Sequence, residues 1–492
     1  MRVRIVPTAS GKKAVQVVSK HYGKVTVHKH IGSFATDEEK TILLSQAEVF
    51  IHQGQTNLFE TLSTFRPTDV AISDNRPLFI YQLLSAIYDK LGLNNFPDTL
   101  IKDLIIARVY QPASKLETSD ILSDLFDREY AIKTVYRHLK KGLEKGIKES
   151  FQKSLIQFAR SGLGDTLKLV FYDVTTLYFE SIVKTDLKEF GFSKDHKSQE
   201  TQVVVGLVVN SLGFPLYFDV FSGKTFEGNT FVPIVKNIQK LVENDELIVV
   251  ADAAMISVDN IQKLESEGIG FIVGARLSNL PASTIDLIFN QLKKQDGEMI
   301  TTTYREQRLI CHYSAKRAAK DKSDRTKQIE RVKNAIGSPS KITSRYRFMK
   351  ADKDKYSLNT TVIEKAEKLE GIKGYLTNTT LSEQTIIDRY HDLWKVEKAF
   401  RITKTDLEAR PIFHRLDETI KAHLVIVFAG LAITRYLELK TNLSIKRILK
   451  IAGKVLTHKV TNTKTGETAY VETTIEEPEL KEKISLLKSL GH

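Results

Sequence analysis

Three short stretches of this chain place acidic residues where an apolar strand is expected to end or a helix to turn, and this limits what the chain can fold into. They are Leu167–Glu180 (LKLVFYDVTTLYFE), Leu247–Ser257 (LIVVADAAMIS) and Ile387–Lys404 (IDRYHDLWKVEKAFRITK). Asp173 lies inside an apolar, β-branched and aromatic run, and Asp252 ends another. Burying an unpaired carboxylate in a strand costs several kcal/mol, so each acid needs a cation or a hydrogen-bond donor nearby. Carboxylates that converge could instead bind divalent metal ions, because Mg²⁺ and Mn²⁺ prefer hard oxygen ligands.

Positive charge is concentrated in one part of the chain. The formal net charge is +13, and the segment from Arg305 to Lys355 holds 16 Lys and Arg against six Asp and Glu. Such a concentration indicates a polyanionic partner, because each phosphate neutralised by a cation releases counterions. The alternative is a solvated, partly disordered loop that binds nothing. A carboxylate metal site in the same chain favours a nucleic acid, since two ions about 4 Å apart can activate water or a 3′-hydroxyl.

Length and composition restrict the class of protein. A chain of 492 residues predicts two to four domains. The longest mostly apolar stretch, Ala422–Ile433, is too short to span a bilayer, so no membrane partner is expected. Cys311 is the only cysteine, which excludes an intramolecular disulfide and a cysteine-cluster metal site. Because the N-terminus has no signal-peptide core, we expect a cytoplasmic, nucleoid-associated protein.

The first third of the chain predicts a small β region followed by helices. Polar and apolar residues alternate in Ala14–Ile31, which is typical of a β-hairpin. From about residue 77 to residue 160 the pattern is mostly helical. Within it, the basic segment Lys133–Lys141 follows a short acidic one, Ser119–Phe126. The pair indicates a helix-turn-helix-like DNA reader, although amphipathic helices with basic faces are common.

The middle of the chain predicts a mixed α/β sheet with helices on both faces. Three apolar runs, Leu167–Phe179, Gln202–Val209 and Pro215–Phe221, precede a strand-helix-strand pattern that reaches residue 275. Asp252 lies at the carboxyl end of its strand, where α/β sheets usually place ligands. The alternative role for Asp252 is to cap the N-terminus of the next helix.

Residues 383 to 404 read as one long helix, and five of its residues share one stripe because they lie three or four positions apart. They are Tyr390, Trp394, Glu397, Arg401 and Lys404. A carboxylate flanked by a phenol, an indole and two cations is typical of a metal ligand beside a phosphate backbone. The alternative is a face of i,i+4 salt bridges that packs on the core through Trp394 and Phe400.

These blocks resemble those of bacterial insertion-sequence transposases with a DDE triad, in the IS-four group, whose third block has the signature Y-x2-R-x3-E-x6-K. Tyr390, Glu397 and Lys404 match the signature, and Leu393 stands where the family has an arginine. Arg401 or Lys395 could replace the missing phosphate contact. Three flanking blocks share the resemblance, Gly191–Lys197 (GFSKDHK), Gly223–Asn229 (GKTFEGN) and Phe400–Pro411 (FRITKTDLEARP). The resemblance covers nearly the whole chain, from about residue 3 to about residue 440.

The resemblance implies a ribonuclease-H-like core with a β-rich insertion and helical N- and C-terminal regions. It implies three catalytic residues that also bind two Mg²⁺ ions, with Mn²⁺ as an alternative: Asp173, Asp252 and Glu397. It implies DNA contacts for Tyr390 and Lys404, and we expect Trp394 and Arg401, on the same stripe, to contact DNA as well. The implied reaction is cleavage of double-stranded DNA at terminal inverted repeats, followed by attack of the freed 3′-hydroxyl on target DNA. Pairing two ends would require a homodimer on DNA.

Pattern and resemblance together divide the chain into six parts. These are an N-terminal β-hairpin and helix region (1–60), a helical region expected to bind DNA (61–165), the first part of the core (166–275), a basic β-rich insertion (276–380), the second part of the core with the Glu397 helix (381–440) and a C-terminal tail (441–492). Two other functions remain open. One is a ribonuclease-H-like nuclease without strand transfer, and the other is a non-catalytic DNA-binding protein descended from a transposase.

Overall fold

The computed structural model of the chain forms two compact units. It describes residues 2–8, 12–21, 24–34, 36, 39–40, 43–44, 46–47, 51, 70–193, 199–243, 246–255, 257–337, 346–352, 355–463 and 466–491. The first unit consists of Met1–Phe79 and Lys454–Glu476, and the second of Ile80–Gly453 and Glu477–His492. Most of the block GFSKDHK lies outside the described residues. The predicted six-part division stays a prediction.

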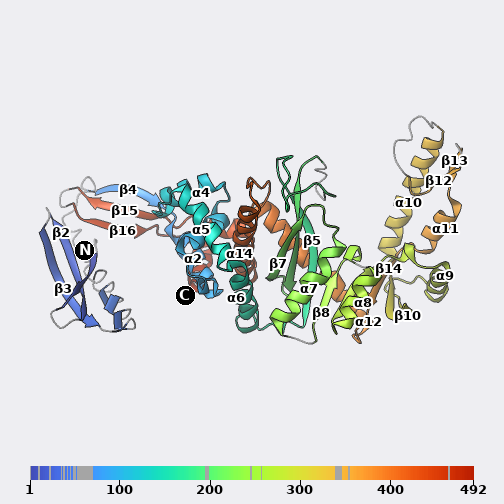
Figure 1. The fold of residues 1–492 in the computed structure, drawn as a ribbon, viewed down its shortest axis with the longest axis horizontal. Coiled ribbons are helices and arrows are strands. Elements are labelled where there is room, and N and C mark those ends of the chain that lie inside the picture. Colours follow the sequence, from blue (N-terminus) through green and yellow to red (C-terminus); the bar gives the residue numbers. More distant parts are fainter. Residues whose placement is uncertain are drawn as a thin grey trace. The chain divides into compact units, whose positions relative to one another are not determined.

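The first unit contains two small antiparallel sheets (Figure 1). One consists of β1 (Arg2–Pro7), β2 (Lys13–His21) and β3 (Lys24–Phe34), and Val15, Val17 and Phe34 lie in its core. The predicted hairpin is confirmed, since Lys24 pairs with His21. The other sheet has the order β16-β15-β4, from β4 (Val70–Arg76), β15 (Thr457–Asn462) and β16 (Thr468–Glu472). The final part of the chain therefore does not form a simple tail, because β15 pairs with β4 from the other end of the sequence.

The second unit begins with a bundle of helices packed around one apolar helix. Its members are α2 (Leu78–Lys90), η3 (Leu93–Asn95), α3 (Thr99–Tyr110), α4 (Lys115–Phe126), α5 (Ile132–Glu144), α6 (Ile147–Ser161), α14 (Asp417–Thr441), α15 (Ile445–Ala452) and α16 (Pro478–Leu490). Ser114 caps α4 by accepting a hydrogen bond from the backbone N–H of Glu117, as its serine-to-glutamate spacing favours. Helix α14 packs against α3 and α5. It is long and apolar enough to cross a membrane, but 94% of its most apolar window is buried inside the protein, which makes it the core helix of the bundle.

An eight-stranded mixed sheet forms the rest of the core, in the order β10-β11-β14-β9-β8-β5-β6-β7. Its strands are β5 (Leu169–Tyr178), β6 (Gln202–Asn210), β7 (Pro215–Ser222), β8 (Ile248–Ala251), β9 (Gly270–Ala275), β10 (Met299–Tyr304), β11 (Gln307–Tyr313) and β14 (Ile372–Thr377). Strand β8 runs parallel to β5 and β9, and the other pairings are antiparallel. The three apolar runs predicted from the sequence are confirmed as β5, β6 and β7.

Helices cover both faces of this sheet, as predicted. On one face, Tyr172 OH lies 2.6 Å from Thr230 Oγ1 of α7 (Gly228–Val242), and α8 (Val258–Ser266) packs beside α7. On the other face, the Phe218 ring lies 4.6 Å from the ring of Phe428 in α14. Because Tyr172 and Asp173 are successive residues of β5, Asp173 belongs to the face opposite α7.

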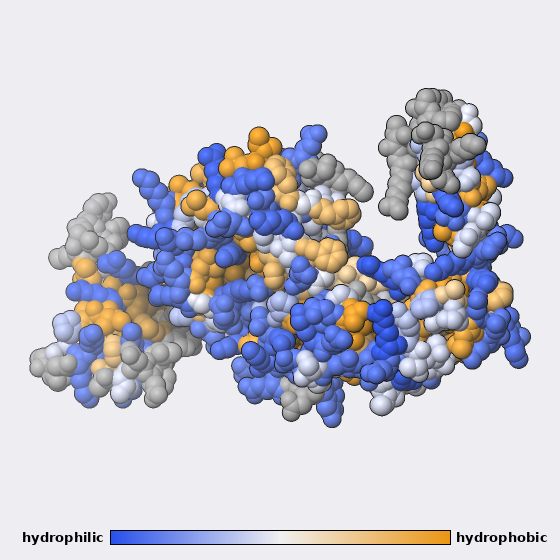
Figure 2. Space-filling view, turned by 45° about the vertical axis from the view of Figure 1, so that its right-hand side comes forward, coloured by the Kyte–Doolittle hydropathy of each residue, from blue (hydrophilic) through white to orange (hydrophobic). Residues whose placement is uncertain are grey.

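Residues 276–380, predicted as a basic β-rich insertion, contribute both strands and helices. Strands β10, β11 and β14 join the main sheet (Figure 1). The centre of the basic stretch forms a long helix, α10 (Ala315–Ile336), because it is rich in Lys, Arg and Ala, which favour helix. The remaining elements are η5 (Leu277–Asn279), α9 (Ala282–Gln291), α11 (Thr360–Lys368) and the small hairpin of β12 (Met349–Asp352) and β13 (Lys355–Leu358). In Figure 2 hydrophilic side chains cover much of the visible surface of α10 and its neighbours, at the upper right.

Candidate active site

Asp173 and Asp252 lie side by side on neighbouring parallel strands. The last paired residues of β5 and β8 are Tyr172 and Ala251, and the two aspartates follow directly. Neighbouring strands are roughly 4.8 Å apart, and residues at the same register point to the same face. Two carboxylates that are separated by 79 positions in the numbering therefore meet at the carboxyl end of β8.

The two carboxylates are held in the same way. Oδ1 of Asp173 accepts a hydrogen bond from the backbone N–H of Val174 at 2.7 Å, and Oδ1 of Asp252 accepts one from Ala253 at 2.7 Å. The alternative role of Asp252 as a helix cap is wrong, because Ser257 caps α8 by accepting from the N–H of Asn260. Asp252 is followed instead by the short 3₁₀ helix η4 (Ala253–Met255).

Tyr390 reaches the same place from α12 (Glu383–His391). Its hydroxyl donates a hydrogen bond to Oδ1 of Asp252 at 2.9 Å, and its side chain is buried. Gly274 makes room for it, because a Cβ atom on this residue would lie 2.4 Å from the Tyr390 oxygen. Desolvation, followed by the charge of Asp252, raises the pKa of Tyr390, so the phenol stays a neutral donor.

The predicted single helix from residue 383 to residue 404 is wrong. After α12, the N–H of Leu393 bonds to the carbonyl of Tyr390 and that of Lys395 to Asp392, both in the tighter i,i+3 pattern. α13 (Trp394–Arg401) follows and runs into a π-helical turn, η7 (Ile402–Asp406). A tightened turn advances each residue further around the axis than an α-turn does, so the predicted straight stripe is not maintained. Leu393 is 7% exposed, so the position of the family's arginine faces the core in this chain.

Lys373 lies beside Tyr390, and no prediction from the sequence included it. Its ammonium lies 4.3 Å from the centre of the Tyr390 ring. Burial and then Arg317 lower the pKa of Lys373, while the charges of Asp252 and Glu397 oppose that shift. Glu397 itself lies in the first turn of α13, which packs on β5 and β6. Alternation in β14 puts Lys373 and Tyr375 on one face, and a lysine in that pattern is the signal that could have identified it.

A cleft of about 790 Å³ opens from this site toward α10 and α11. Asp252, Tyr390 and Lys373 line its sheet side. Cations on the opposite side include Arg317, Arg325, Arg347 and Lys365. Arg325 is neutralised by ion pairs with Glu367 and Glu370 at 2.7 and 2.6 Å. The cleft is thus mixed in charge, with acids at the sheet and mostly cations on the helices.

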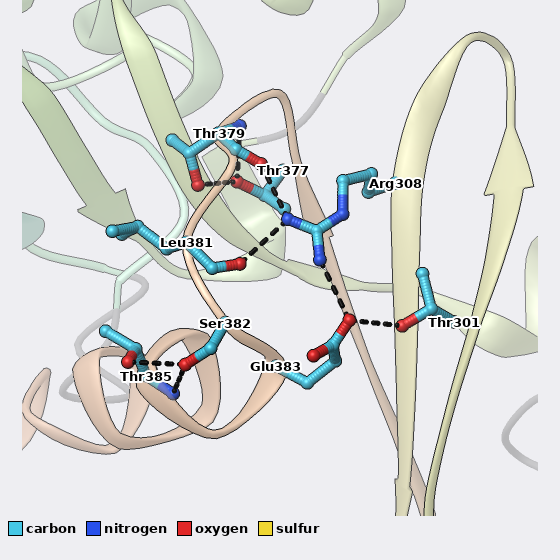
Figure 3. Close-up of polar contacts among 8 residues, drawn as sticks. All are labelled: Thr301, Arg308, Thr377, Thr379, Leu381, Ser382, Glu383 and Thr385. Carbon is cyan, nitrogen blue, oxygen red and sulfur yellow. Dashed lines mark hydrogen bonds and ion pairs between the residues drawn. The ribbon is translucent and has the colours of Figure 1, made fainter.

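The start of α12 is fixed by Arg308 of β11 (Figure 3). One guanidinium nitrogen donates to the carbonyls of Thr379 and Leu381, both at 2.8 Å, and another contacts Glu383 at 2.9 Å. Ser382 caps the helix by accepting from the N–H of Thr385. Arg308 therefore ties the loop after β14 to the sheet, and this loop sets where α12 presents Tyr390.

Comparison with protein families decides the class. A family model described as a transposase DDE domain matches residues 166–433, more than half of the chain, and the match contains all three predicted acids. This chain belongs to the transposase DDE domain family. The family implies an enzyme that cleaves nucleic acid, and its members generally use divalent metal ions.

Two other comparisons add little about the transposase. Among curated proteins, none matches it. Among solved structures, it is similar to a chain from the cryo-EM structure of a piggyBac transposase synaptic complex with hairpin DNA, at 10% sequence identity and a TM-score of 0.40. The match covers 84% of the transposase and 88% of that chain. A score at this level carries no argument about fold or function.

The other predicted DNA contacts of the transposase lie apart from the cleft. Trp394 is 53% exposed, so it does not pack on the core as the salt-bridge alternative requires. Trp394 and the exposed Arg401 line a separate hollow of about 600 Å³. Lys404 is half-buried in the π-helical turn. Lys395 donates to the carbonyl of Ser211 at 2.8 Å and pairs with Asp392 at 3.0 Å, so structural contacts already engage it.

The carboxylates fit a divalent metal ion in part. Asp173 and Asp252 give two hard oxygen donors at one register, and the described residues offer Oδ2 of Asp252 no hydrogen-bond partner. Across the part of the chain that the structure describes, however, no three His, Cys, Asp or Glu residues are close enough to hold an ion together. The two aspartates thus form a partial ligand set, and Glu397 is not gathered into it in this arrangement.

Proposed function

We propose that this protein is a DNA transposase that cleaves double-stranded DNA at transposon inverted repeats and joins the freed 3′ end to target DNA. The observation that carries the proposal is the pair of Asp173 and Asp252, held at one register beside Tyr390 and Lys373. Membership of the transposase DDE domain family supports the same chemistry.

In this proposal Asp173 and Asp252 hold Mg²⁺, or Mn²⁺ as an alternative, and Glu397 completes the ligand set when the ions and DNA are present. Two such ions would activate the attacking water or 3′-hydroxyl and neutralise charge on the phosphate. The protein's share is to hold the two aspartates in one orientation through the N–H groups of Val174 and Ala253, which fixes where the phosphate must lie.

The cations around the cleft would position the DNA backbone. Arg347 and Lys365 face the cleft opposite the acids, and α10 has eight Lys and Arg against three acidic residues. Trp394, Arg401 and Lys404 would hold a further part of the duplex, where an exposed indole can stack on a base. Tyr390 would contact the DNA backbone only after leaving Asp252.

We further propose a ribonuclease-H-like core, membership of the IS-four group and a homodimer on DNA in the bacterial cytoplasm. The mixed sheet with acids on neighbouring central strands supports the core assignment. The signature residues Tyr390, Glu397 and Lys404 support the group, with Leu393 as its departure. The helical region with α4 and α5 would bind the inverted repeat.

One experiment tests the function against its rivals. The purified protein is incubated with Mg²⁺, a target plasmid and a duplex that ends in the inverted repeat flanking its own gene. Joined products support transposition, cleavage alone supports a nuclease, and a bound but uncut duplex supports a DNA-binding protein. Asp173→Asn should abolish product and leave DNA affinity largely unchanged. The matched control is Asp259→Asn, since Asp259 is an exposed acid of α8 that pairs with the exposed Lys263 on the same helix. Activity that survived Asp173→Asn would refute the metal assignment.

A further inference from the structure

Lys373 is a cation built into the acid site. It comes from β14, two strands away from β8, and shares a sheet face with Gly274 and Asp252 through the pairing of Tyr375 with Gly274. Its ammonium lies over the face of the Tyr390 ring at 4.3 Å, and that ring's hydroxyl is bonded to Asp252. Lys373 lies in none of the three sequence stretches that contain the predicted acids.

The surroundings of Lys373 explain why a positive charge is held there. Asp173 and Asp252 lie at one register on neighbouring strands, so their like charges repel each other. The charges of Asp252 and Glu397 oppose the lowering of the Lys373 pKa, although no ion pair within 4.0 Å joins Lys373 to an acid among the described residues. Lys373 therefore adds a positive charge beside the acid site, over the ring that is bonded to Asp252, without ligating it.

A metal ion that bound the same carboxylates would be repelled by the positive charge of Lys373. Two cations near one set of acids repel each other, so Lys373 and a metal ion compete for the same negative charge. The side chain of Lys373 has a flexible four-carbon stem. It can turn into the adjacent cleft, toward Arg317 and the space that a DNA strand would fill.

We propose that Lys373 is a positioning residue that takes the place of the metal charge in the resting site and turns to a DNA phosphate when metal binds. This inference rests on the proposed function. In the metal-free protein Lys373 lies over the ring of Tyr390, whose hydroxyl is bonded to Asp252. In the loaded protein it supplies the site with the backbone cation that Leu393 cannot.

Binding of Mn²⁺ to the full chain without DNA, measured from the electron paramagnetic resonance signal of free Mn²⁺, tests the first half. Lys373→Gln should bind Mn²⁺ about threefold to tenfold more tightly than the unaltered protein, because a competing charge is removed. Lys373→Arg should bind it as weakly as the unaltered protein. The control is Lys368→Gln, a cation of α11 that pairs with Asp286, and it should leave Mn²⁺ affinity unchanged. Equal or weaker binding by a folded Lys373→Gln protein would overturn the proposal.

The salt dependence of DNA binding tests the second half. With Mg²⁺ present, and with Asp173→Asn in the background so that no cleavage occurs, Lys373→Gln should reduce the slope of log Kd against log salt by about 0.9, the loss of one phosphate contact. Without metal the slope should not change. A change of slope in both conditions would contradict the switch. Suppose the unaltered protein bound Mn²⁺ and cleaved DNA, and Lys373→Gln had the same Mn²⁺ affinity and the same salt dependence of DNA binding. Only this inference would then fail. If the unaltered protein bound no Mn²⁺ and cleaved nothing, the proposed function would fail with it.

Discussion

The hydroxyl of Tyr390 donates a hydrogen bond to Oδ1 of Asp252, which joins a helix after the basic insertion to the end of a central strand. This bond connects the third predicted block, which contains Tyr390, to the second, which contains Asp252. It also gives Tyr390 a structural role in addition to the proposed DNA contact, and the two roles can be separated by experiment.

Tyr390→Phe should lower the free energy of unfolding by about 1 kcal/mol, since it removes one part-buried hydrogen bond and keeps the ring. Strand cleavage should fall about tenfold, because Asp252 loses a donor that orients it, while DNA affinity stays unchanged. Urea denaturation, a cleavage assay and a DNA-binding titration measure the three quantities. Weaker DNA binding with normal stability would instead favour a direct DNA contact.

Gly274→Ala should disturb the same bond from the other side. The new methyl group would lie 2.4 Å from the Tyr390 oxygen, so the phenol must move away from Asp252. We expect a loss of about 1–3 kcal/mol in stability, together with loss of cleavage. Gly337→Ala is the control, because its Cβ would have only ordinary contacts at 3.6 Å, and it should change stability by less than about 0.5 kcal/mol.

Arg308→Ala should loosen the start of α12. It removes two hydrogen bonds to carbonyls and a partly exposed contact with Glu383, so we expect a loss of about 2 kcal/mol after discounting the exposed ion pair. Amide hydrogen exchange should become faster in residues 379–390. Thr301→Ala removes only a hydroxyl contact with Glu383 and should leave exchange in that segment nearly unchanged.

Stability should fall in mild acid because of His423 in α14 and the neighbouring His414. Burial lowers the pKa of His423 well below its usual range and that of His414 to about 3, and nearby Lys115 and Arg108 add to both shifts. The folded protein keeps these rings neutral, whereas the unfolded chain binds protons below about pH 6.5. Stability is therefore complete above that pH and decreases by up to about 1.4 kcal/mol per histidine for each pH unit below it, until the folded pKa is reached.

Urea denaturation at pH 7.5, 6 and 5 measures this slope. His423→Gln should make the slope shallower, whatever it does to stability at pH 7.5, because one of the two titrations is removed. An identical slope in the variant would show that His423 does not control the acid response.

Local pattern was enough to predict much of the core. The runs that became β5, β6 and β7 are apolar and β-branched between turn residues, so their boundaries could be read within one or two positions. The side-by-side placement of Asp173 and Asp252 could be anticipated too, because both follow buried strand residues and the resemblance put them in one site.

Features that depend on distant partners could not be predicted in this way. Strand β4 pairs with β15, and nothing local in its sequence indicates a partner almost four hundred residues away. The tightened turn at Leu393 depends on how α12 and α13 pack on the sheet, and helical periodicity alone favours a continuous helix. Lys373 acquires its role only because β14 returns beside β9.

The segment between β11 and β14, which carries α10 and α11, begins and ends at the same place. Strands β11 and β14 are paired, and the N–H of Ser314 donates to the carbonyl of Gly371 at 2.9 Å. Everything between these two residues could thus be exchanged for a short reverse turn without breaking the sheet that carries the aspartates. The sheet that positions the acid pair therefore closes on itself beneath this segment, and α10 and α11 stand on it as a part that can be replaced separately.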